Sequence, residues 1–308
     1  MTLRVTFLGT AGAVPTTERN PSGLLINREG DRLLFDAGEG TQRQMMRYGT
    51  GFSLSDVFLT HLHGDHVYGL PGLLETMDFN DREAGLTIHA PPRTRADVTA
   101  LITACGASPS FPVHVAEVAP GETAIEREEY VVRAVGTDHR TTAVGYALIE
   151  AERKGRFDRE RAEELGVPVG PKFSRLHEGK PVELEDGTVV DPEQVVGPPR
   201  PGRRVVYTGD TRPCEAVIEA ADGADLLIHD ATFAAEYADR AVETGHATAG
   251  EAGEVAAAAG AARLALTHIS SRYAGDASVL GREAREAFDG EVQVARDGLA
   301  IEVPYPDG

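Results

Sequence analysis

Short apolar runs alternate with polar, glycine-containing turns from the first residues of the chain. The early runs read LRVTFLG, GLLIN, RLLFDAG and DVFLTHLHGDH, and the last two end in polar loops. The section over residues 113–150 is also β-rich. Further strands follow Arg203, as RRVVYTGD, ADLLIHDATF, ARLALTHISSRY, EVQVA and LAIEV. Loops that follow strands carry many binding and catalytic groups, so these strand ends are the first places to look for chemistry.

Helical patterns separate these strands. The pattern predicts helices over residues 41–48, 67–77, 93–105, 248–260 and 276–288. Strands that end in polar loops in both halves of the chain predict an α/β (α+β) protein, in which two sheets pack as a sandwich with helices outside.

Between about residues 150 and 202 the pattern changes to proline, glycine and charge, with little core-forming periodicity. This indicates an inserted flexible arm at residues 152–202, within a single domain that spans residues 1–308. From Glu150 to Arg204 there are 11 basic and 12 acidic residues, which leaves −18 of the net charge of −19 on the other 253 residues. This local neutrality favours a contact surface for a negatively charged partner, and the alternative is a solvated linker.

The composition narrows the class of protein. With 41% hydrophobic residues, the 308-residue chain has ample material for a core. Only three of its 30 basic residues are lysines, and excess carboxylate with scarce lysine resembles proteins of salt-loving microbes, although coding bias produces the same pattern. Two cysteines are too few for a disulfide framework, and no stretch approaches the roughly 20 apolar residues of a membrane span. A cytoplasmic protein without membrane contact is expected.

The run HLHGDH holds three of the ten histidines of the chain together with an aspartate. In an extended loop His61 and His63 point to one side, since alternate residues share a face. Asp65 and His66 are adjacent, so they need a turn at Gly64 to converge on a second point. Imidazole and carboxylate are zinc ligands, and one short loop therefore offers donors to two metals.

Four ligands are too few for two metals, so further donors are expected at the ends of other strands. The candidates are His139 in VGTDHRTT, Asp210 in VVYTGDTRP and His268 in LALTHISSRY. Each of them, taken alone, is more often a turn or capping residue. Together with the histidine-rich loop they predict a two-metal site.

This set resembles the metallo-β-lactamase superfamily, and the resemblance implies a four-layer αβ/βα sandwich with two zinc ions, or with manganese or another divalent metal. It implies a bridging role for Asp210 and an orienting role for Asp36 in LLFDAGEG. The remaining ligands that it implies are His61, His63 and His139 for one metal, and Asp65, His66 and His268 for the other.

A narrower resemblance, over nearly the whole chain, is to the short form of the ribonuclease Z family of tRNA 3′-processing endonucleases. It rests on LGTAGAVPTTERNPSGLLI, LLFDAGEGTQRQM, the metal loop, YTGDT, HDATF, GHATAGEAGEVA and THISSRY, in this order. It implies that Gly170 and Pro171, in GVPVGPKF of the arm, grip pre-tRNA and that the protein is a homodimer. Thr17 stands where the family carries a lysine in the loop P-x-K-x-R-N, which leaves discrimination against CCA-ended tRNA unpredicted.

The resemblance implies zinc-dependent cleavage of the 3′ trailer of pre-tRNA after the discriminator nucleotide, with a 3′-hydroxyl left on the tRNA and a 5′-phosphate on the trailer. Asp65 is expected to bind metal and to orient or deprotonate the attacking water. His246 is the expected proton donor, tuned by Glu251 or another carboxylate. Thr248 is expected to cap the alanine-rich helix, whose amides then face a phosphate, and Arg272 to make a second phosphate contact.

Other functions fit part of the pattern. A small-molecule phosphodiesterase, or another two-metal hydrolase of the superfamily such as a thioester or lactone hydrolase, explains the ligands but leaves the arm without a role. A non-catalytic nucleic-acid-binding or metal-storage protein is disfavoured, because no ligand is missing. Among the remaining histidines, His229 in LLIHDATF is the best candidate to support the site.

Overall fold

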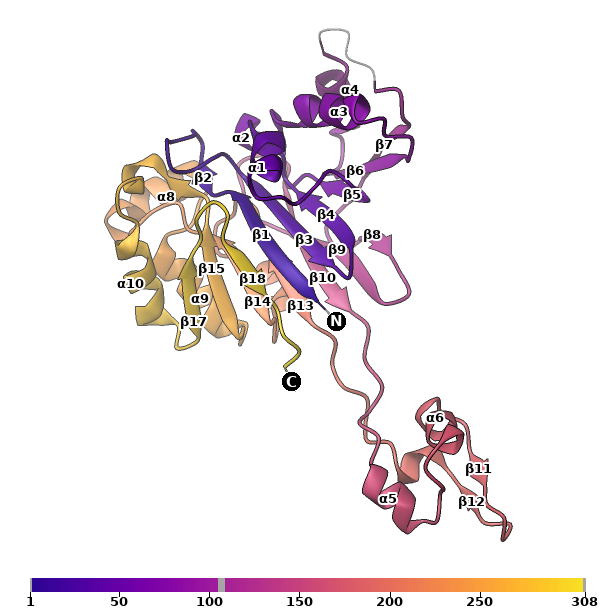
Figure 1. Cartoon of the computed structure of the whole chain (residues 1–308). Helices are drawn as coiled ribbons and strands as arrows, with labels where there is room; N and C mark the ends of the chain where they lie inside the picture. Colours follow the sequence, from indigo (N-terminus) through magenta and orange to yellow (C-terminus); the bar gives the residue numbers. More distant parts are fainter. Residues whose placement is uncertain (1, 105–108, 307–308) are drawn as a thin grey trace. The chain divides into compact units, whose positions relative to one another are not determined.

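The computed structural model describes residues 2–104 and 109–306. Its internal contacts divide the chain into two compact units. The main unit is formed by the residues up to Ile149 together with Arg203–Pro304, and the arm unit by Glu150–Gly202 with the chain end from Tyr305 (Figure 1). None of the helices in the described part of the chain is long and apolar enough to cross a membrane.

Two sheets of seven strands form the main unit, in the orders β18-β1-β3-β4-β5-β6-β7 and β17-β15-β14-β13-β10-β9-β8. The first sheet consists of β18 (Ala300–Glu302), β1 (Leu3–Gly9), β3 (Gly23–Arg28), β4 (Asp31–Phe35), β5 (Asp56–Phe58), β6 (Leu86–Ala90) and β7 (Val113–Glu117). The second consists of β17 (Glu291–Val294), β15 (Arg263–Thr267), β14 (Leu226–Asp230), β13 (Arg204–Tyr207), β10 (Val144–Glu150), β9 (Tyr130–Gly136) and β8 (Thr123–Glu126). A short parallel pair, β2 (Ala11–Gly12) with β16 (Ile269–Ser270), joins the segments that follow β1 and β15.

The two-residue period of the strands sorts side chains between the inner and outer faces of each sheet. In β13, Val205 and Tyr207 belong to the core cluster that both sheets share, whereas Val206 belongs to a cluster with outer helices. In β1, Phe7 belongs to the shared core, while its neighbour Leu8 packs on the opposite side with helical residues. Both faces of each sheet are therefore covered.

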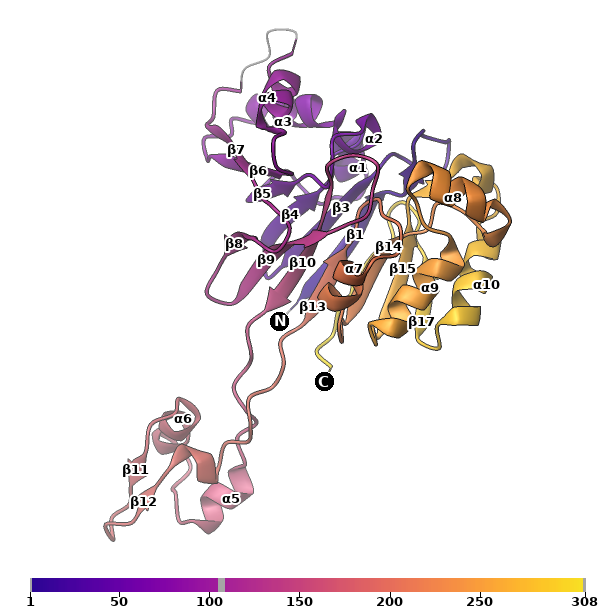
Figure 2. The same ribbon diagram turned by 180° about the vertical axis from the view of Figure 1, so that it is seen from behind.

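Helices complete the outer layers and confirm the expected four-layer αβ/βα order (Figures 1 and 2). The first sheet is covered by α1 (Thr41–Arg47), α3 (Leu70–Phe79) and α4 (Arg95–Ile102), with the short α2 (Gly64–Val67) in the histidine loop. The second is covered by α7 (Glu215–Ala220), α9 (Ala249–Ala258) and α10 (Ser278–Ala287), and α8 (Ala238–Thr244) precedes His246. The helix predicted over residues 93–105 ends at Ile102, and Cys105 lies outside the described residues.

The arm unit has a small hydrophobic core of its own, which the sequence pattern did not predict. It contains α5 (Arg159–Glu164), α6 (Pro171–His177) and the hairpin of β11 (Val182–Glu183) with β12 (Val189–Val190). The buried residues of this core are Ala162, Val167, Leu176, Val182, Val190 and Val195. They are spread among proline, glycine and charged residues, so no single window shows a helix or strand period.

Candidate metal centre

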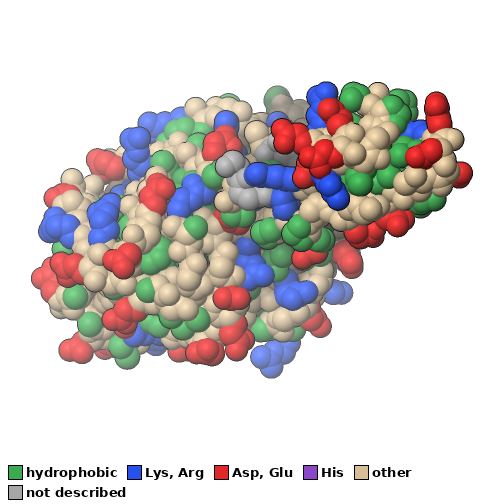
Figure 3. Space-filling model, turned by 90° about the horizontal axis from the view of Figure 1, so that it is seen from below, with side chains coloured by type: hydrophobic (Ala, Val, Ile, Leu, Met, Phe, Trp, Pro, Cys, Tyr) green, Lys and Arg blue, Asp and Glu red, His purple; other side chains and the backbone are tan. Residues whose placement is uncertain are grey.

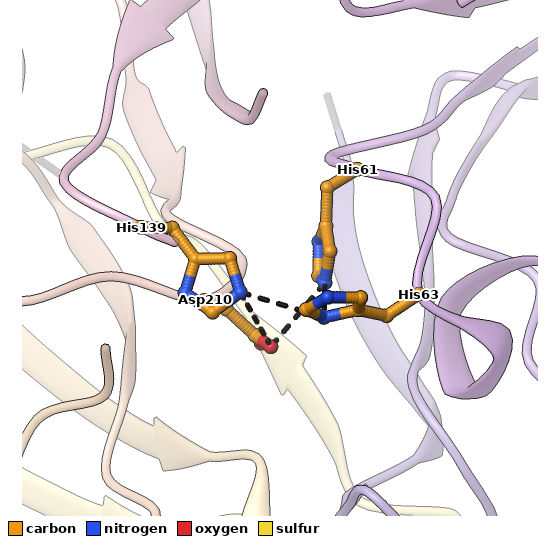
Figure 4. Close-up of side chains that lie close together, drawn as sticks. All are labelled: His61, His63, His139 and Asp210. Atoms are coloured by element: carbon orange, nitrogen blue, oxygen red, sulfur yellow. Dashed lines mark hydrogen bonds and ion pairs between the residues drawn. The ribbon is translucent and has the colours of Figure 1, made fainter. Parts of the chain in front are cut away.

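The candidate metal ligands lie on loops that follow strands of both sheets. The histidine loop follows β5, and His139, Asp210 and His268 follow β9, β13 and β15. Asp36 follows β4 in the same way. Figure 4 shows His61 and His63 facing His139 and Asp210 across the space between the two halves of the main unit.

Four donor atoms form the first candidate metal set. His61 Nε2 lies 2.9 Å from His63 Nδ1 and 3.4 Å from Asp210 Oδ2. His139 Nε2 lies 3.4 Å from His63 Nδ1 and 3.9 Å from Asp210 Oδ2. All four donors lie within 4.8 Å of one another, a spacing that allows one cation to bind them together (Figure 4).

The second candidate set lies on the other side of Asp210. Asp65 Oδ2 is 3.2 Å from His268 Nε2 and 3.6 Å from His66 Nε2. Asp210 Oδ1 is 3.3 Å from the Nε2 atoms of both His66 and His268. Asp210 therefore directs one carboxylate oxygen to each set, as a bridging ligand requires.

The donors of the second set fit a cation. His66 Nε2 and Asp210 Oδ1 are buried and make no hydrogen bond within the described residues, although they lie 3.3 Å apart. Buried polar atoms in native proteins are nearly always partnered, so such atoms indicate a missing ligand. Imidazole nitrogens and carboxylate oxygens are the donors that zinc and related divalent metals accept.

The electrostatics of two ligands, His61 and Asp210, favour metal binding as well. Burial, followed by the charge of the neighbouring His66, holds the pKa of His61 well below its usual range. Burial opposes ionisation of Asp210, but the surrounding imidazoles outweigh it and hold the pKa of this carboxyl low. His61 and Asp210 are therefore in the protonation states that bind metal. Burial disfavours the charged form of His66, but Asp210 and Asp36 outweigh it and raise the pKa of this ring well above its usual range, so a cation would have to displace its proton.

Asp36 orients one ligand from the side of the first sheet. It is fully buried, with a left-handed backbone (φ 57°). Its carboxylate accepts hydrogen bonds from the Thr60 amide, the Tyr207 hydroxyl and Nδ1 of His66, each at 2.8 Å. Since Nδ1 of His66 is held in this way, Nε2 is the atom that faces Asp210 and the second metal set.

Three other ligand imidazoles are also held through the ring nitrogen that faces away from the candidate metal. Each has its second ring nitrogen at hydrogen-bond distance from a hydroxyl or a carbonyl oxygen, which fixes the orientation of the ring. The three contacts are His61 Nδ1 to Thr60 Oγ1 at 3.1 Å, His139 Nδ1 to the Gly245 carbonyl at 2.8 Å, and His268 Nδ1 to Thr232 Oγ1 at 2.8 Å.

Close backbone approaches hold this arrangement together. A Cβ atom on Gly12 would lie 2.7 Å from Nδ1 of His268, and one on Gly38 would lie 2.3 Å from the carbonyl oxygen of Asp65. Real Cβ atoms do not approach other atoms so closely, so both positions require glycine. The amide of Ala13 donates to Asp65 Oδ2 at 2.8 Å, which ties the loop after β1 to the second set.

His246 has a carboxylate partner, but it is Asp230 and not Glu251. His246 Nδ1 lies 2.9 Å from Asp230 Oδ2 and 3.9 Å from Asp210 Oδ2. Burial on its own disfavours the imidazolium, but the fully buried Asp230 outweighs it and raises the pKa of His246 to about 9. At neutral pH the ring therefore carries a proton beside the candidate metal centre, as a proton donor requires.

Thr248 and Glu251 together form the N-terminal cap of α9. Thr248 caps α9 as predicted: its hydroxyl oxygen accepts a hydrogen bond from the amide of Glu251, and the Glu251 carboxylate accepts one from the amide of Thr248, which completes a capping box. The amides of Thr248, Ala249 and Glu251 donate inside the protein. The phosphate contact expected at this helix end stays a prediction. Glu251 also pairs with Arg212, which donates to the His246 carbonyl at 2.6 Å, so it supports the backbone of the proton donor.

Sequence reasoning missed Asp230 and selected its neighbour His229. His229 is fully buried, and its Nδ1 lies 2.7 Å from the backbone carbonyl of Asp230. The two-residue period of β14 could have identified Asp230. Ile228 belongs to the core between the sheets, and Leu227 belongs to the outer cluster. Asp230 shares the inner side with Ile228, and His229 shares the outer side with Leu227.

The remaining predicted residues are exposed. Arg272 is exposed, with Nη1 3.2 Å from Ser270 Oγ, and no carboxylate pairs with it in the described part of the chain. Gly170 and Pro171 belong to the arm unit, where they are exposed at the start of α6. Thr17 is exposed, and its hydroxyl donates to the adjacent Glu18 at 2.5 Å.

Comparison with known proteins places this geometry in a family. Two family models match parts of the chain, "Anti-Pycsar protein Apyc1" over residues 3–105 and "Beta-lactamase superfamily domain" over residues 194–269. "Ribonuclease Z" of Natronomonas pharaonis is 64% identical over 307 residues, 100% of both chains, and that of Myxococcus xanthus is 51% identical over 99% of both. The crystal structure of human tRNase Z, short form, superposes with a TM-score of 0.71 at 27% identity, and covers 98% of this chain and 99% of that one.

The paired seven-stranded sheets, the outer helices and the converging histidine and aspartate side chains define a metal-dependent hydrolase of the metallo-β-lactamase superfamily. Within that superfamily the identity to curated relatives extends over the whole chain. The chain belongs to the ribonuclease Z family.

Proposed function

We propose that this protein is a zinc-dependent endoribonuclease that removes the 3′ trailer from pre-tRNA. The cut falls after the discriminator nucleotide and leaves a 3′-hydroxyl on the tRNA and a 5′-phosphate on the trailer. One observation carries the proposal: Asp210 directs one oxygen to each of two ligand sets, and a protonated His246 lies 3.9 Å from the same carboxylate. Full-length similarity to ribonuclease Z enzymes supports the choice of substrate.

The chain offers donors for two ions. His61, His63 and His139 would hold one, and the nitrogen-rich set favours zinc, although manganese or another divalent metal is compatible with these donors. Asp65, His66 and His268 would hold the second, with Asp210 between the two. Two bound cations lower the pKa of water and neutralise charge on a phosphodiester.

Protein groups would perform the remaining steps. Asp65 would orient the attacking water and accept its proton, because its carboxylate faces the second set. As the bond between phosphorus and O3′ of the discriminator nucleotide breaks, His246 would donate its proton to O3′. Asp230 keeps that proton available, and Arg272 would make a contact to the charged phosphate.

The arm unit is proposed as the tRNA grip, with Gly170 and Pro171 in its contact surface. On the face of the molecule in Figure 3, acidic and basic side chains are interspersed and no continuous basic surface forms. The arm, nearly neutral in a strongly acidic chain, is the local site that we propose for RNA contact. High salt weakens phosphate contacts by counterion release, so shape and metal contacts carry a larger share of the affinity.

The first test is incubation of zinc- or manganese-loaded protein with a pre-tRNA that carries a 3′ trailer, at high salt, with both new ends mapped. Cleavage after the discriminator nucleotide is expected. Absence of this cut, with turnover of bis(p-nitrophenyl) phosphate intact, would instead indicate a small-molecule phosphodiesterase.

Deletion of Gly155–Gly197 tests the grip. We expect the loss of pre-tRNA cleavage with turnover of bis(p-nitrophenyl) phosphate and metal content retained, because all candidate ligands belong to the main unit. Equal loss of both activities would contradict a separate grip.

We further propose that the protein acts in the cytoplasm as a homodimer, in which the arm of one subunit grips the tRNA that the other cleaves. Mixing the arm-deleted chain with a full-length His246→Ala chain should then restore cleavage that neither chain shows alone. No recovery in a mixture that light scattering shows to be dimeric would contradict this division of labour.

A further inference from the structure

A row of rings leads outward from the candidate metal centre. The ring of the ligand His268 stacks on His246, with centroids 4.9 Å apart. The ring of Phe233 lies 6.3 Å from His246, and the ring of Tyr237 lies 6.2 Å from Phe233. Phe233 is 4% exposed and Tyr237 is 36% exposed, so the row begins at the metal site and ends in solvent.

The outer end of this row carries a cation. The Arg272 guanidinium carbon lies 5.3 Å from the centroid of the Tyr237 ring and 5.7 Å from that of Phe233. Although the chain has 49 acidic residues, Arg272 has no carboxylate partner within residues 2–104 and 109–306. The Tyr237 hydroxyl likewise makes no hydrogen bond to the described residues. The one side-chain hydrogen bond of Arg272 to the described residues is to Ser270 Oγ, so most of its donors are left for a ligand.

An exposed aromatic ring beside an unpaired arginine has the chemistry of a single-stranded nucleic-acid site. Bases stack on tyrosine and on the guanidinium plane, while the positive charge attracts the backbone. A peptide or a lipid surface would instead be expected to need a wider apolar face, whereas Phe233 is already buried against His246.

We propose that Tyr237 and Arg272 form the stacking site for the base of the discriminator nucleotide. This inference rests on the proposed function, in which His246 protonates O3′ of that nucleotide. The ribose must then lie against His246, and the next rings outward are Phe233 and Tyr237. Every base has a π face, so such a site holds the last nucleotide of the tRNA without selecting its sequence.

A double-substitution cycle tests the assignment. With intact pre-tRNA, Tyr237→Ala should lower kcat/KM roughly ten-fold, the usual effect of losing one stacked base, and Tyr237→Phe should restore activity because it keeps the ring. When the discriminator base is replaced by an abasic residue, wild-type cleavage should fall by the same factor and Tyr237→Ala should cause no further loss. When the abasic residue is instead the first trailer nucleotide, the ten-fold loss should persist.

Phe79→Ala is the matched control, since Phe79 is an exposed aromatic residue on α3, outside the row of rings, and is 88% exposed. Its kcat/KM should equal that of the wild type with all three substrates. Equal losses for Tyr237→Ala with and without the discriminator base would overturn the proposal. A loss that disappears only with the abasic trailer nucleotide would overturn it as well.

Binding provides a readout that does not depend on cleavage. A mature tRNA with 2-aminopurine at the discriminator position should lose fluorescence when it binds the wild-type protein, and Tyr237→Ala should abolish this quenching. Quenching without any cleavage of pre-tRNA would refute the proposed function and keep the stacking site. If pre-tRNA is cleaved but Tyr237→Ala quenches as the wild type does, the proposed function would stand and the stacking site would be refuted.

Discussion

Asp36 and Asp230 are fully buried carboxylates at the ends of strands, one in each sheet, and both hold a histidine. Asp36 holds the candidate ligand His66 at 2.8 Å, and the remaining donors to it are the neutral groups of Thr60 and Tyr207. Asp230 holds His246 at 2.9 Å and keeps that ring protonated.

The difference lies in what the far side of each histidine faces. The far nitrogen of His66 is buried against Asp210 and has no hydrogen bond, so fixing its orientation prepares it to bind a cation. His246 is part-exposed at the edge of the site, so its proton can be passed to a substrate. The same local device, a buried carboxylate on an imidazole, serves metal binding in one sheet and proton transfer in the other.

The largest effect is expected for His246→Ala. Cleavage of pre-tRNA should fall by about two to four orders of magnitude, because the leaving oxygen loses its proton donor. Bis(p-nitrophenyl) phosphate should be affected far less, since p-nitrophenolate leaves without protonation. Parallel kinetics with both substrates check this, with His114→Ala, an exposed histidine on β7, as the control. Equal losses with both substrates would mean that His246 supports the metals instead.

Asp230→Asn should reduce pre-tRNA cleavage by roughly ten- to a hundred-fold, a smaller loss than removal of the donor itself. In the metal-free protein, NMR titration should place the pKa of His246 at about 9 in the wild type and clearly lower in the variant. The exposed Asp239→Asn serves as the control. An unchanged titration curve would show that Asp230 does not raise the pKa of His246.

The same pair makes the stability of the metal-free protein depend on pH. The pKa of His246 is raised from 6.5 when unfolded to about 9 when folded, so the stabilisation is complete below 6.5 and disappears as pH rises through 9. The wild type should lose up to about 3 kcal/mol of unfolding free energy over this interval, relative to Asp230→Asn. Urea unfolding at pH 6 and pH 9.5 measures the difference, and parallel pH profiles would contradict it.

Asp36→Asn should act on the metals and leave the proton donor alone. Loss of the carboxylate behind His66 should weaken metal affinity by about ten- to a hundred-fold, as measured by chelator competition. The titration of His246 should stay at its wild-type position. A shift of that titration without a loss of metal affinity would reverse the roles assigned to the two carboxylates.

Tyr207→Phe is the mildest test, because it removes one of the hydrogen bonds to Asp36. Metal affinity should fall less than ten-fold, and unfolding free energy by about 1–3 kcal/mol. Tyr146→Phe is the matched control, since its buried hydroxyl donates to the Leu59 carbonyl and does not contact Asp36. It should cost similar stability and leave metal affinity unchanged.

Much of this arrangement is local in origin and could be predicted. Alternation of apolar residues predicts the two sheets, and donors at strand ends lead to His139, Asp210 and His268. The capping role of Glu251 could also be predicted from the sequence, since Thr248 and Glu251 have the T-x-x-E spacing of a capping box.

What could not be predicted depends on contacts between distant segments. Asp230 and His246 are sixteen residues apart, and the loop between them gives no sign of which carboxylate will face the ring. Arg212 reaches Glu251 from 39 residues away, and only the folded chain brings them together. The core of the arm unit could not be predicted either, because its apolar residues come from separate short segments and meet only in the folded chain.

The register of β10 with β13 has a consequence for how this fold can vary. Ile149 pairs with Arg204 in an antiparallel ladder, so the arm leaves and re-enters the main unit on neighbouring strands. A tight turn could close the same ladder, and each doubling of a flexible loop costs only about 0.6 kcal/mol. The stability of the sheet should therefore depend only weakly on the length of the segment inserted there. We therefore expect the junction to accept arms of other sizes, which makes it a suitable position for engineered chimaeras.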